Sequence, residues 1–219
     1  MATSQTLSNY TVTNGIGNPT TAVRDVTNNA LVHLTFTNSF PNGISNTIMI
    51  NGVQDLSNNA IVNGTGTFSF YTAQRYDIVI DELVADPTPV VGLPDYEWIE
   101  LKNTTTFPIN LQGWKISDAT GTSGTMPNFI LQPNGYVIVC TGSAVAAMSA
   151  LGSTITVTSF PSLDNNGEIL SLSDASGKVI HALTYDISWY QNELKKDGGW
   201  SLEMIDTKNP CTGGSNWKA

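Results

Sequence analysis

Short runs that alternate apolar and polar residues recur along the whole chain, with turn residues between them. In residues 30–36 (ALVHLTF) and again in residues 97–103 (EWIELKN), apolar side chains stand at every second position. Period two is the pattern of a half-buried β-strand. Asn42–Gly43 and residues 133–135 (PNG) supply turn chemistry between such runs. Many short strands at this spacing predict an all-β protein built from sandwiches, and they argue against an α/β fold.

Helical signals are scarce. Only 12% of the residues are charged, while Thr, Asn, Ser and Gly abound, a balance that favours strands and turns. One helix is predicted, over residues 143–152 (SAVAAMSALG), where Ser143 is placed to cap the start and Gly152 to end the helix.

Charge and hydropathy exclude several classes of function. The formal net charge is −9 and the pI is about 4.4, so the surface repels phosphate backbones and nucleic acid is not an expected partner. No run of about 18 apolar residues is present, which predicts no membrane span. The first ten residues, MATSQTLSNY, lack the basic start and apolar run of a secretory signal.

Residues 73–76 (AQRY) separate two series of strands. The sequence therefore predicts two β-sandwich modules in tandem, at residues 1–74 and 75–219. The single predicted helix belongs to the second module.

The second module carries several motifs in a fixed order. They are Asp86-Pro87-x-Pro89, the run Leu93–Asn103 (LPDYEWIELKN) and the run Ile109–Asp118 (INLQGWKISD). With later stretches up to Asn216-Trp217, residues 76–219 resemble the bacterial lamin-tail domain, in the version found in Bacteroidetes surface proteins. The resemblance implies an immunoglobulin-like sandwich, a secreted or cell-surface location, and a chain in which catalysis is carried by other domains.

The first module resembles a different family. Residues 5–74, with the turn at residues 55–58 (DLSN) and the strand at 67–72 (TFSFYT), are similar to the C-terminal part of a bacterial Ig-like domain of the S-layer-associated type. That family has one or two further strands before this point. The resemblance implies a domain that is N-terminally truncated or completed by a neighbour, with a strand edge open to pairing.

Acidic residues crowd the first hairpin of the second module: Asp81, Glu82, Asp86, Asp95, Glu97 and Glu100. A solvated turn and strand face is the favoured interpretation. The alternatives are a calcium site at Asp86, Asp95 and Glu97, catalytic carboxylates, and a partner surface. Glu97 and Glu100 are an odd number of residues apart, so their side chains are predicted to point to opposite faces of a strand.

Aromatic residues give a second candidate site. Trp114 and Trp200 lie in strand-like patterns and are predicted to be core residues. Trp189 and Tyr190 precede the polar run 191–199 and are candidates for an exposed platform that stacks on sugar rings.

Nucleophilic catalysis finds little support. No Gly-x-Ser-x-Gly, His-Glu-x-x-His or Walker motif is present. His33 is interpreted as a strand-face residue and His181 as a packed one. Cys140 and Cys211 are open to two interpretations, a Cys-His enzyme, which nothing else in the sequence supports, or a disulfide that pins the C-terminal tail to the sandwich.

The sequence as a whole predicts a non-enzymatic extracellular module for structure or adhesion, part of a larger secreted or surface-anchored bacterial protein. Its expected partners are other domains of the same chain, a cell-surface protein or a polysaccharide. The alternative is a carbohydrate-binding module, with or without the help of calcium, and a hydrolase is the third hypothesis. No other cofactor is expected.

Overall fold

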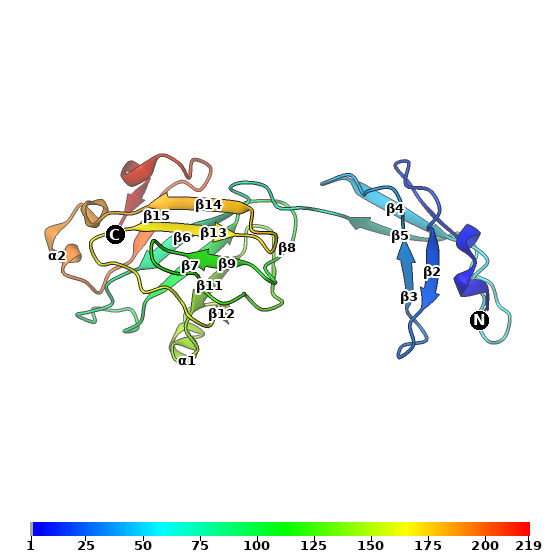
Figure 1. Ribbon diagram of the computed structural model, residues 1–219, viewed down its shortest axis with the longest axis horizontal. Coiled ribbons are helices and arrows are strands. Elements are labelled where there is room, and N and C mark those ends of the chain that lie inside the picture. Colours follow the sequence, from blue (N-terminus) through cyan, green and yellow to red (C-terminus); the bar gives the residue numbers. More distant parts are fainter. Residues whose placement is uncertain (1) are drawn as a thin grey trace. The chain divides into compact units, whose positions relative to one another are not determined.

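Short β-strands make up most of the regular structure in the computed structural model, which describes residues 2–219 (Figure 1). The chain divides between Thr72 and Ala73 into two units, called here the N-terminal unit and the C-terminal unit. The all-β prediction is confirmed. No helix in the described residues is long and apolar enough to cross a membrane.

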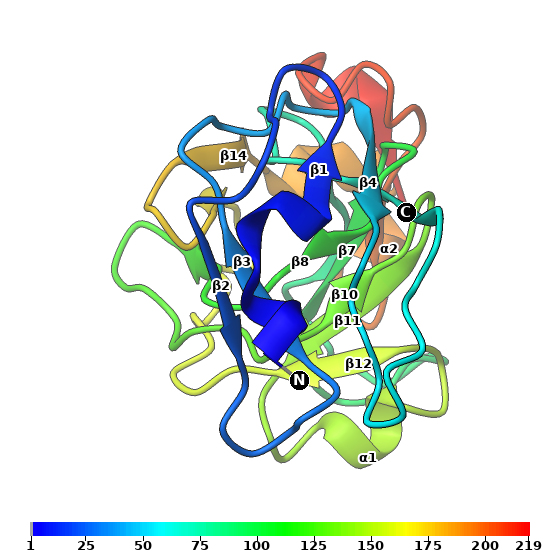
Figure 2. The same cartoon turned by 90° about the vertical axis from the view of Figure 1, so that its right-hand side faces the viewer.

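The N-terminal unit holds two small antiparallel sheets (Figure 2). One has the strand order β1-β4-β5 and the other pairs β2 with β3. The strands are β1 (Tyr10–Val12), β2 (Thr21–Arg24), β3 (Val32–Thr35), β4 (Ser45–Ile50) and β5 (Gly64–Ser69), preceded by the 3-10 turns η1 (Ala2–Gln5) and η2 (Leu7–Asn9). The alternation in residues 30–36 thus forms β3, whose register sets Leu34 opposite Ala22.

The interior of this unit is thin. Its buried apolar side chains among the described residues are Tyr10, Val12, Ile16 and Ala22. Phenylalanines fill the next layer, where the ring of Phe40 lies 5.4 Å from Phe36, 5.2 Å from Phe68 and 6.4 Å from Phe70, centroid to centroid. The pairs with Phe36 and Phe68 pack edge to face, which adds to the stabilisation from burial.

The C-terminal unit is a sandwich of two larger sheets. A six-stranded sheet with the order β12-β11-β7-β6-β15-β16 faces a three-stranded sheet with the order β14-β13-β9, and β10 pairs with β8 beside them (Figure 1). The strands are β6 (Ile78–Val84), β7 (Trp98–Asn103), β8 (Ile109–Asn110), β9 (Lys115–Ser117), β10 (Ile130–Leu131), β11 (Tyr136–Cys140), β12 (Thr154–Thr156), β13 (Ile169–Ser173), β14 (Val179–Thr184), β15 (Leu202–Met204) and β16 (Trp217–Lys218).

Period-two patterning places the core between these sheets. On the inner side of the six-stranded sheet, Ile99 pairs with Leu83 and Leu101 pairs with Ile80, and all four side chains are fully buried. Alternate residues of β13 and β9, such as Leu172 and its partner Ile116, meet them from the other sheet. Interdigitation of two inner faces is the usual core of a sandwich.

Part of the outer face of the six-stranded sheet is also covered. Val84, Trp98, Ile138 and Cys140 project outward and pack against Ala144 and Met148 of the segment that contains the helix α1 (Val145–Met148). Leu93 and Tyr96 close the side of this cluster. The outer-facing Trp98 is therefore buried, although its strand alternates.

The helix is shorter than the sequence predicts. It spans four residues, and Ser143 does not cap it, since the Ser143 hydroxyl is 2.9 Å from that of Thr141. A second short helix, α2 (Glu193–Lys196), was not predicted because it has no apolar periodicity. Its N-cap is Asn192, whose side chain accepts a hydrogen bond from the Leu194 N–H.

A β-bulge in β6 lies next to a hydrogen bond that joins the two sheets. The register between β6 and β7 shifts between Ile80 and Glu82, which makes Asp81 the extra residue. The N–H of Ile80 donates to Nδ1 of His181 on β14, at 2.9 Å. His181 is fully buried, so the prediction of a packed histidine is confirmed.

Candidate functional site

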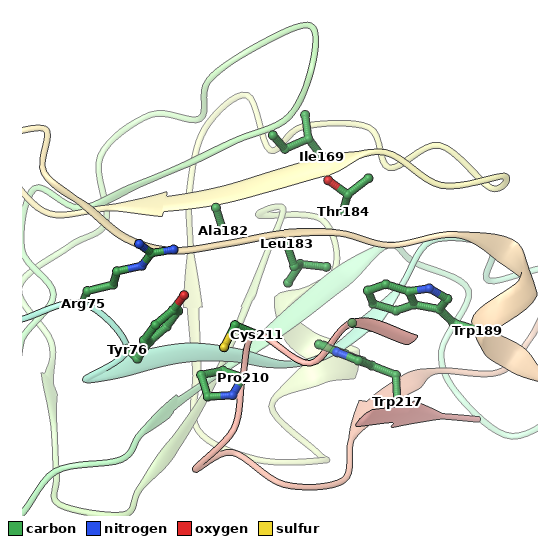
Figure 3. A pocket seen from close by; sticks show the side chains of 11 residues that line it. Arg75, Tyr76, Ile169, Ala182, Leu183, Thr184, Trp189, Pro210, Cys211 and Trp217 are labelled. Atoms are coloured by element: carbon green, nitrogen blue, oxygen red, sulfur yellow. The ribbon is translucent and has the colours of Figure 1, made fainter. Parts of the chain in front are cut away.

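An aromatic groove opens on the C-terminal unit, with a volume of about 280 Å³ (Figure 3). The name denotes the space lined by Arg75, Tyr76, Leu183, Trp189, Pro210 and Trp217. Arg75 and Tyr76, in the segment before β6, supply one end of the groove, and β14 supplies a wall. The 3-10 turn η3 (Ile187–Tyr190) and the C-terminal tail complete it.

Two tryptophans form one end of the groove. The rings of Trp189 and Trp217 lie 5.6 Å apart at 34°, with Trp217 buried and Trp189 half-buried. Gly214 permits this packing, because a Cβ atom at that position would lie 2.5 Å from Nε1 of Trp189. The Gln191 side chain donates to the carbonyl of Trp217 at 3.3 Å and so holds the turn against the tail.

A cation and a tyrosine form the other end. The guanidinium carbon of Arg75 lies 4.7 Å from the ring centroid of Tyr76, a cation–π contact. Arg75 is exposed, so its N–H donors also face solvent. An open groove with aromatic rings and a charged donor can bind a flat, hydroxyl-rich ligand.

Trp189 and Tyr190, the two residues of the predicted stacking platform, lie in different environments. Only Trp189 reaches the groove. Tyr190 is 6% exposed, its hydroxyl lies 3.3 Å from the carbonyl oxygen of Trp200, and burial raises its pKa to about 12. The expectation that both rings show a face is therefore wrong for Tyr190, because consecutive residues in the η3 turn point in different directions.

The core predictions for Trp114 and Trp200 have different outcomes. Trp114 is 4% exposed and belongs to the core, as predicted. Trp200 is 37% exposed, which corrects its assignment to the core. It precedes β15 rather than lying within it, and Nζ of Lys195 sits 4.3 Å from its ring centroid.

A line of carboxylates crosses the outer face of the six-stranded sheet. The register sets Glu100 opposite Glu82, and Glu82 opposite Glu203. We call Glu100, Glu82 and Glu203 the acidic row. Burial and neighbouring carboxylates raise the pKa of Glu100 to about 7, and burial also raises the pKa of Glu82. Asp81 lies beside the row, and burial raises its pKa to about 6.

A protein-family model described as Lamin Tail Domain matches residues 71–186, which is just over half of the 219 residues. The chain belongs to the lamin tail domain family. The resemblance inferred from the sequence motifs is therefore confirmed at the level of the family. Trp189 and Trp217 of the aromatic groove, and Glu203 of the acidic row, lie after the matched residues. No curated protein matches the chain.

In this lamin tail domain the residues proposed for calcium form no metal cluster, although Asp86 lies near enough to Glu97 to help raise its pKa. Asp86 accepts hydrogen bonds from the N–H and hydroxyl of Thr88, and Glu97 accepts one from the N–H of Leu163 at 3.2 Å. Asp95 is exposed. Within residues 2–219, no group of three His, Cys, Asp or Glu side chains is placed to hold a metal ion. Glu97 contacts Leu163, whereas Glu100 lies opposite Glu82 in the acidic row.

The disulfide that the sequence allows is not formed in the structure. Cys140 is buried at the end of β11 and Cys211 is exposed at the rim of the aromatic groove, and both thiols are free. Burial raises the pKa of the Cys140 thiol, which makes it a poor nucleophile.

His181 offers no catalytic base to the lamin tail domain. Its Nδ1 is occupied by the Ile80 N–H, and burial lowers its pKa to about 4, so the ring is neutral near pH 7. Lamin tail domains are in general non-enzymatic. The geometry accordingly favours a site that binds over a site that breaks bonds.

Proposed function

We propose that this chain is a non-catalytic structural and adhesion module of a larger secreted or surface-anchored bacterial protein. The observation that carries the proposal is the construction of the C-terminal unit. Its six-stranded sheet is covered on the inner face by a second sheet and over part of the outer face by the α1 segment. Such a body resists deformation, which suits a module that spaces or displays its neighbours.

The proline-rich loop supports the same function. Residues 86–91 pack directly on Gly198 and Gly199, where a Cβ would clash with the carbonyls of Thr88 and Pro89. The N–H of Gly199 donates to the carbonyl of Asp86 at 2.8 Å. A loop fixed in this way has little conformational entropy left to lose on contact with a partner.

The finer assignments belong to this proposal. The N-terminal unit is taken as a partial bacterial Ig-like domain of the S-layer-associated type, and the C-terminal unit as the Bacteroidetes surface-protein type of lamin tail. Their motifs in the sequence support both assignments. The expected partners are other domains of the same chain and cell-surface proteins or polysaccharides.

Adhesion can be measured directly. Beads coated with the chain are passed over washed bacterial envelopes, with beads carrying heat-unfolded chain as the control. Retention of the folded chain alone is expected. Equal retention of both kinds of bead, or none, would contradict an adhesive role. Turnover of ester, peptide or glycoside substrates in proportion to protein concentration would contradict the non-catalytic assignment.

A second function, carbohydrate binding, is favoured by the aromatic groove. Trp189 is half-exposed beside a buried Trp217, and the Arg75 guanidinium stands at the far end. Aromatic faces stack on the apolar faces of sugar rings while polar donors fix orientation. The described part of the chain contains no preformed cluster of three metal-ligating side chains. Calcium could therefore assist sugar binding only if the ligand itself supplied some of the oxygen atoms that hold the ion.

The test is retention on insoluble polysaccharides, with calcium and then with EDTA. Trp189→Ala should abolish retention, whereas Trp200→Ala, which removes an exposed tryptophan outside the groove, should leave it unchanged. Equal effects of the two substitutions would exclude the groove as the site. Loss of retention in EDTA alone would indicate an acidic site instead.

A further inference from the structure

The acidic row places like charges side by side on adjacent strands. Glu100 on β7, Glu82 on β6 and Glu203 on β15 occupy one line of the register. Adjacent strands are about 4.8 Å apart, so the outer carboxylates are on the order of 10 Å from one another. Like charges directly opposite in a sheet are destabilising. A row of three carboxylates therefore lowers the stability of the folded state unless a cation is bound beside it.

Two lysines flank the row, Lys102 on β7 and Lys218 opposite Glu203 on β16, but neither forms an ion pair with it. Among the described residues, neither Asp81 nor any carboxylate of the row forms an ion pair. Lys102 is the nearest base along β7, but its ammonium lies over the ring of Tyr136, 4.9 Å from the centroid. It attracts Asp81 and Glu100 without contacting them as an ion pair.

Asp81 gives an independent indication that something is missing. The bulge adds this residue beside Glu82, and its side chain is 5% exposed. Its Oδ1 is buried with no hydrogen-bond partner. Buried polar atoms are nearly always paired, so an orphaned carboxylate oxygen next to three other carboxylates needs an explanation.

The spacing argues for an organic cation. No three of these acidic side chains are placed to hold a metal ion. Alternate side chains of an extended peptide are about 7 Å apart, and their flexible stems let two bases span a row on the order of 10 Å long. We propose that the acidic row and Asp81 bind the lysine or arginine side chains of a basic peptide segment of a partner protein.

Binding should depend on pH in one direction. Because burial raises the pKa of Glu100 to about 7 and that of Asp81 to about 6, the site is partly protonated near pH 6–7 and must ionise to hold a cation. Burial raises the pKa of Glu82 in the same direction. Lys102 on β7 and Lys218, opposite Glu203 on β16, are the basic side chains beside the row. Affinity should therefore rise between about pH 5 and pH 8 and fall with added salt.

The experiment uses the full chain and dye-labelled peptides, with fluorescence anisotropy at low ionic strength. The probes are Gly-Lys-Gly-Lys-Gly, its arginine counterpart and its glutamine counterpart. We expect the lysine or arginine peptide to bind and the glutamine peptide not to bind. Glu82→Gln and Glu100→Gln should each weaken binding about tenfold, as expected when one charged partner of a charge-assisted contact is lost.

Glu193→Gln is the matched control. It removes one negative charge from an exposed glutamate of α2 outside the row, and it should leave binding unchanged. Glu100→Gln should also raise the melting midpoint near pH 8, because a carboxyl with a raised folded-state pKa loses stability as the pH rises through it. If this variant is more stable and still fails to bind the peptide, unfolding cannot explain the loss of binding.

Three results would overturn the proposal. Equal binding by the wild type, Glu82→Gln and Glu100→Gln would remove the site. Stoichiometric displacement of the peptide by calcium would make the site a metal site. Spermidine binding as tightly as the peptide would make the ligand a small polyamine and not a peptide segment.

Discussion

The two units share an all-β architecture but differ in how they are held together. Among the described residues, 4 buried apolar side chains lie before Ala73, and the other 33 lie from Ala73 onward. The N-terminal unit leaves large apolar residues such as Val26 and Leu56 almost fully exposed. It relies on side-chain to backbone hydrogen bonds, for example from Asn14 to Ser45 and from Asn18 to Tyr10.

The difference shows that strand pattern and stability are separate properties. Both units have alternating strands, but only the C-terminal unit encloses them between two large sheets. Hydrophobic burial is the dominant stabilising term, while each hydrogen bond adds only about 1 kcal/mol net. We therefore expect the N-terminal unit to unfold first. All five tryptophans lie in the C-terminal unit, so their fluorescence reports on that unit alone.

The largest effect is expected from Leu101→Ala. The side chain is fully buried between the sheets, and its removal should cost the C-terminal unit about 3 kcal/mol. Leu34→Ala, at a half-buried position of β3, should cost about 1 kcal/mol by the same argument. Denaturant unfolding followed by tryptophan fluorescence and by circular dichroism measures both. Equal costs would break the contrast between the units.

His181→Leu tests the polar link inside the larger core. The substitution leaves the Ile80 N–H without an acceptor and should cost about 2 kcal/mol near pH 7. The folded-state pKa of about 4 lies below the usual 6.5, so the wild type loses stability as the pH falls through that interval. The variant lacks this loss, and the gap should narrow below pH 6. A constant gap in melting midpoint would show that the histidine does not titrate on unfolding.

Phe40→Ala tests the smaller unit. Phe40 contacts three other phenylalanine rings but is only half-buried, so its loss should cost about 1.5 kcal/mol. The early part of the circular dichroism transition should move to lower denaturant, while the tryptophan midpoint stays in place. A shift of the tryptophan midpoint would mean that the two units unfold together.

His33→Gln should have the smallest effect. His33 Nε2 lies 2.8 Å from Asp25, but the His33 side chain is 59% exposed. Exposed pairs of this kind contribute little to stability. The melting midpoint should stay within error in both low and high salt. A clear drop in the melting midpoint at low salt would show that the His33–Asp25 ion pair also stabilises the N-terminal unit.

Local chemistry made much of the fold predictable. Alternation identified β3 and β7. The turn residues of the run 174–178 (DASGK) form the hairpin turn between β13 and β14, with Asp174 accepting from the N–H of Lys178. Gly177 takes a positive φ in that turn. These features depend on neighbours in sequence, which is the information that a pattern holds.

Features that depend on distant residues were not predictable. The register that sets Glu203 beside Glu82 joins strands far apart in the chain, so Glu203 was missed as a neighbour of the acidic hairpin. The bulge at Asp81 has no signature in the sequence. Tyr190 is buried and Trp200 is exposed, the reverse of what the sequence predicts. The short elements η3 and α2 place these residues before β15, and neither element has a periodic pattern in the sequence. The metal, sugar-stacking and disulfide hypotheses stay predictions.

The strand order of the larger sheet has a consequence for how the protein is made. Leu83 of β6 pairs with Ile99 on one side and with Leu202 on the other. A chain emerging from the ribosome can form the β6–β7 hairpin early, but the second edge of β6 has no partner until β15 has been synthesised. During that interval the nascent chain presents an apolar, unpaired strand. Folding of the C-terminal unit should therefore be completed only after β15 has been synthesised, and slowly, as is typical of sheets closed by distant segments.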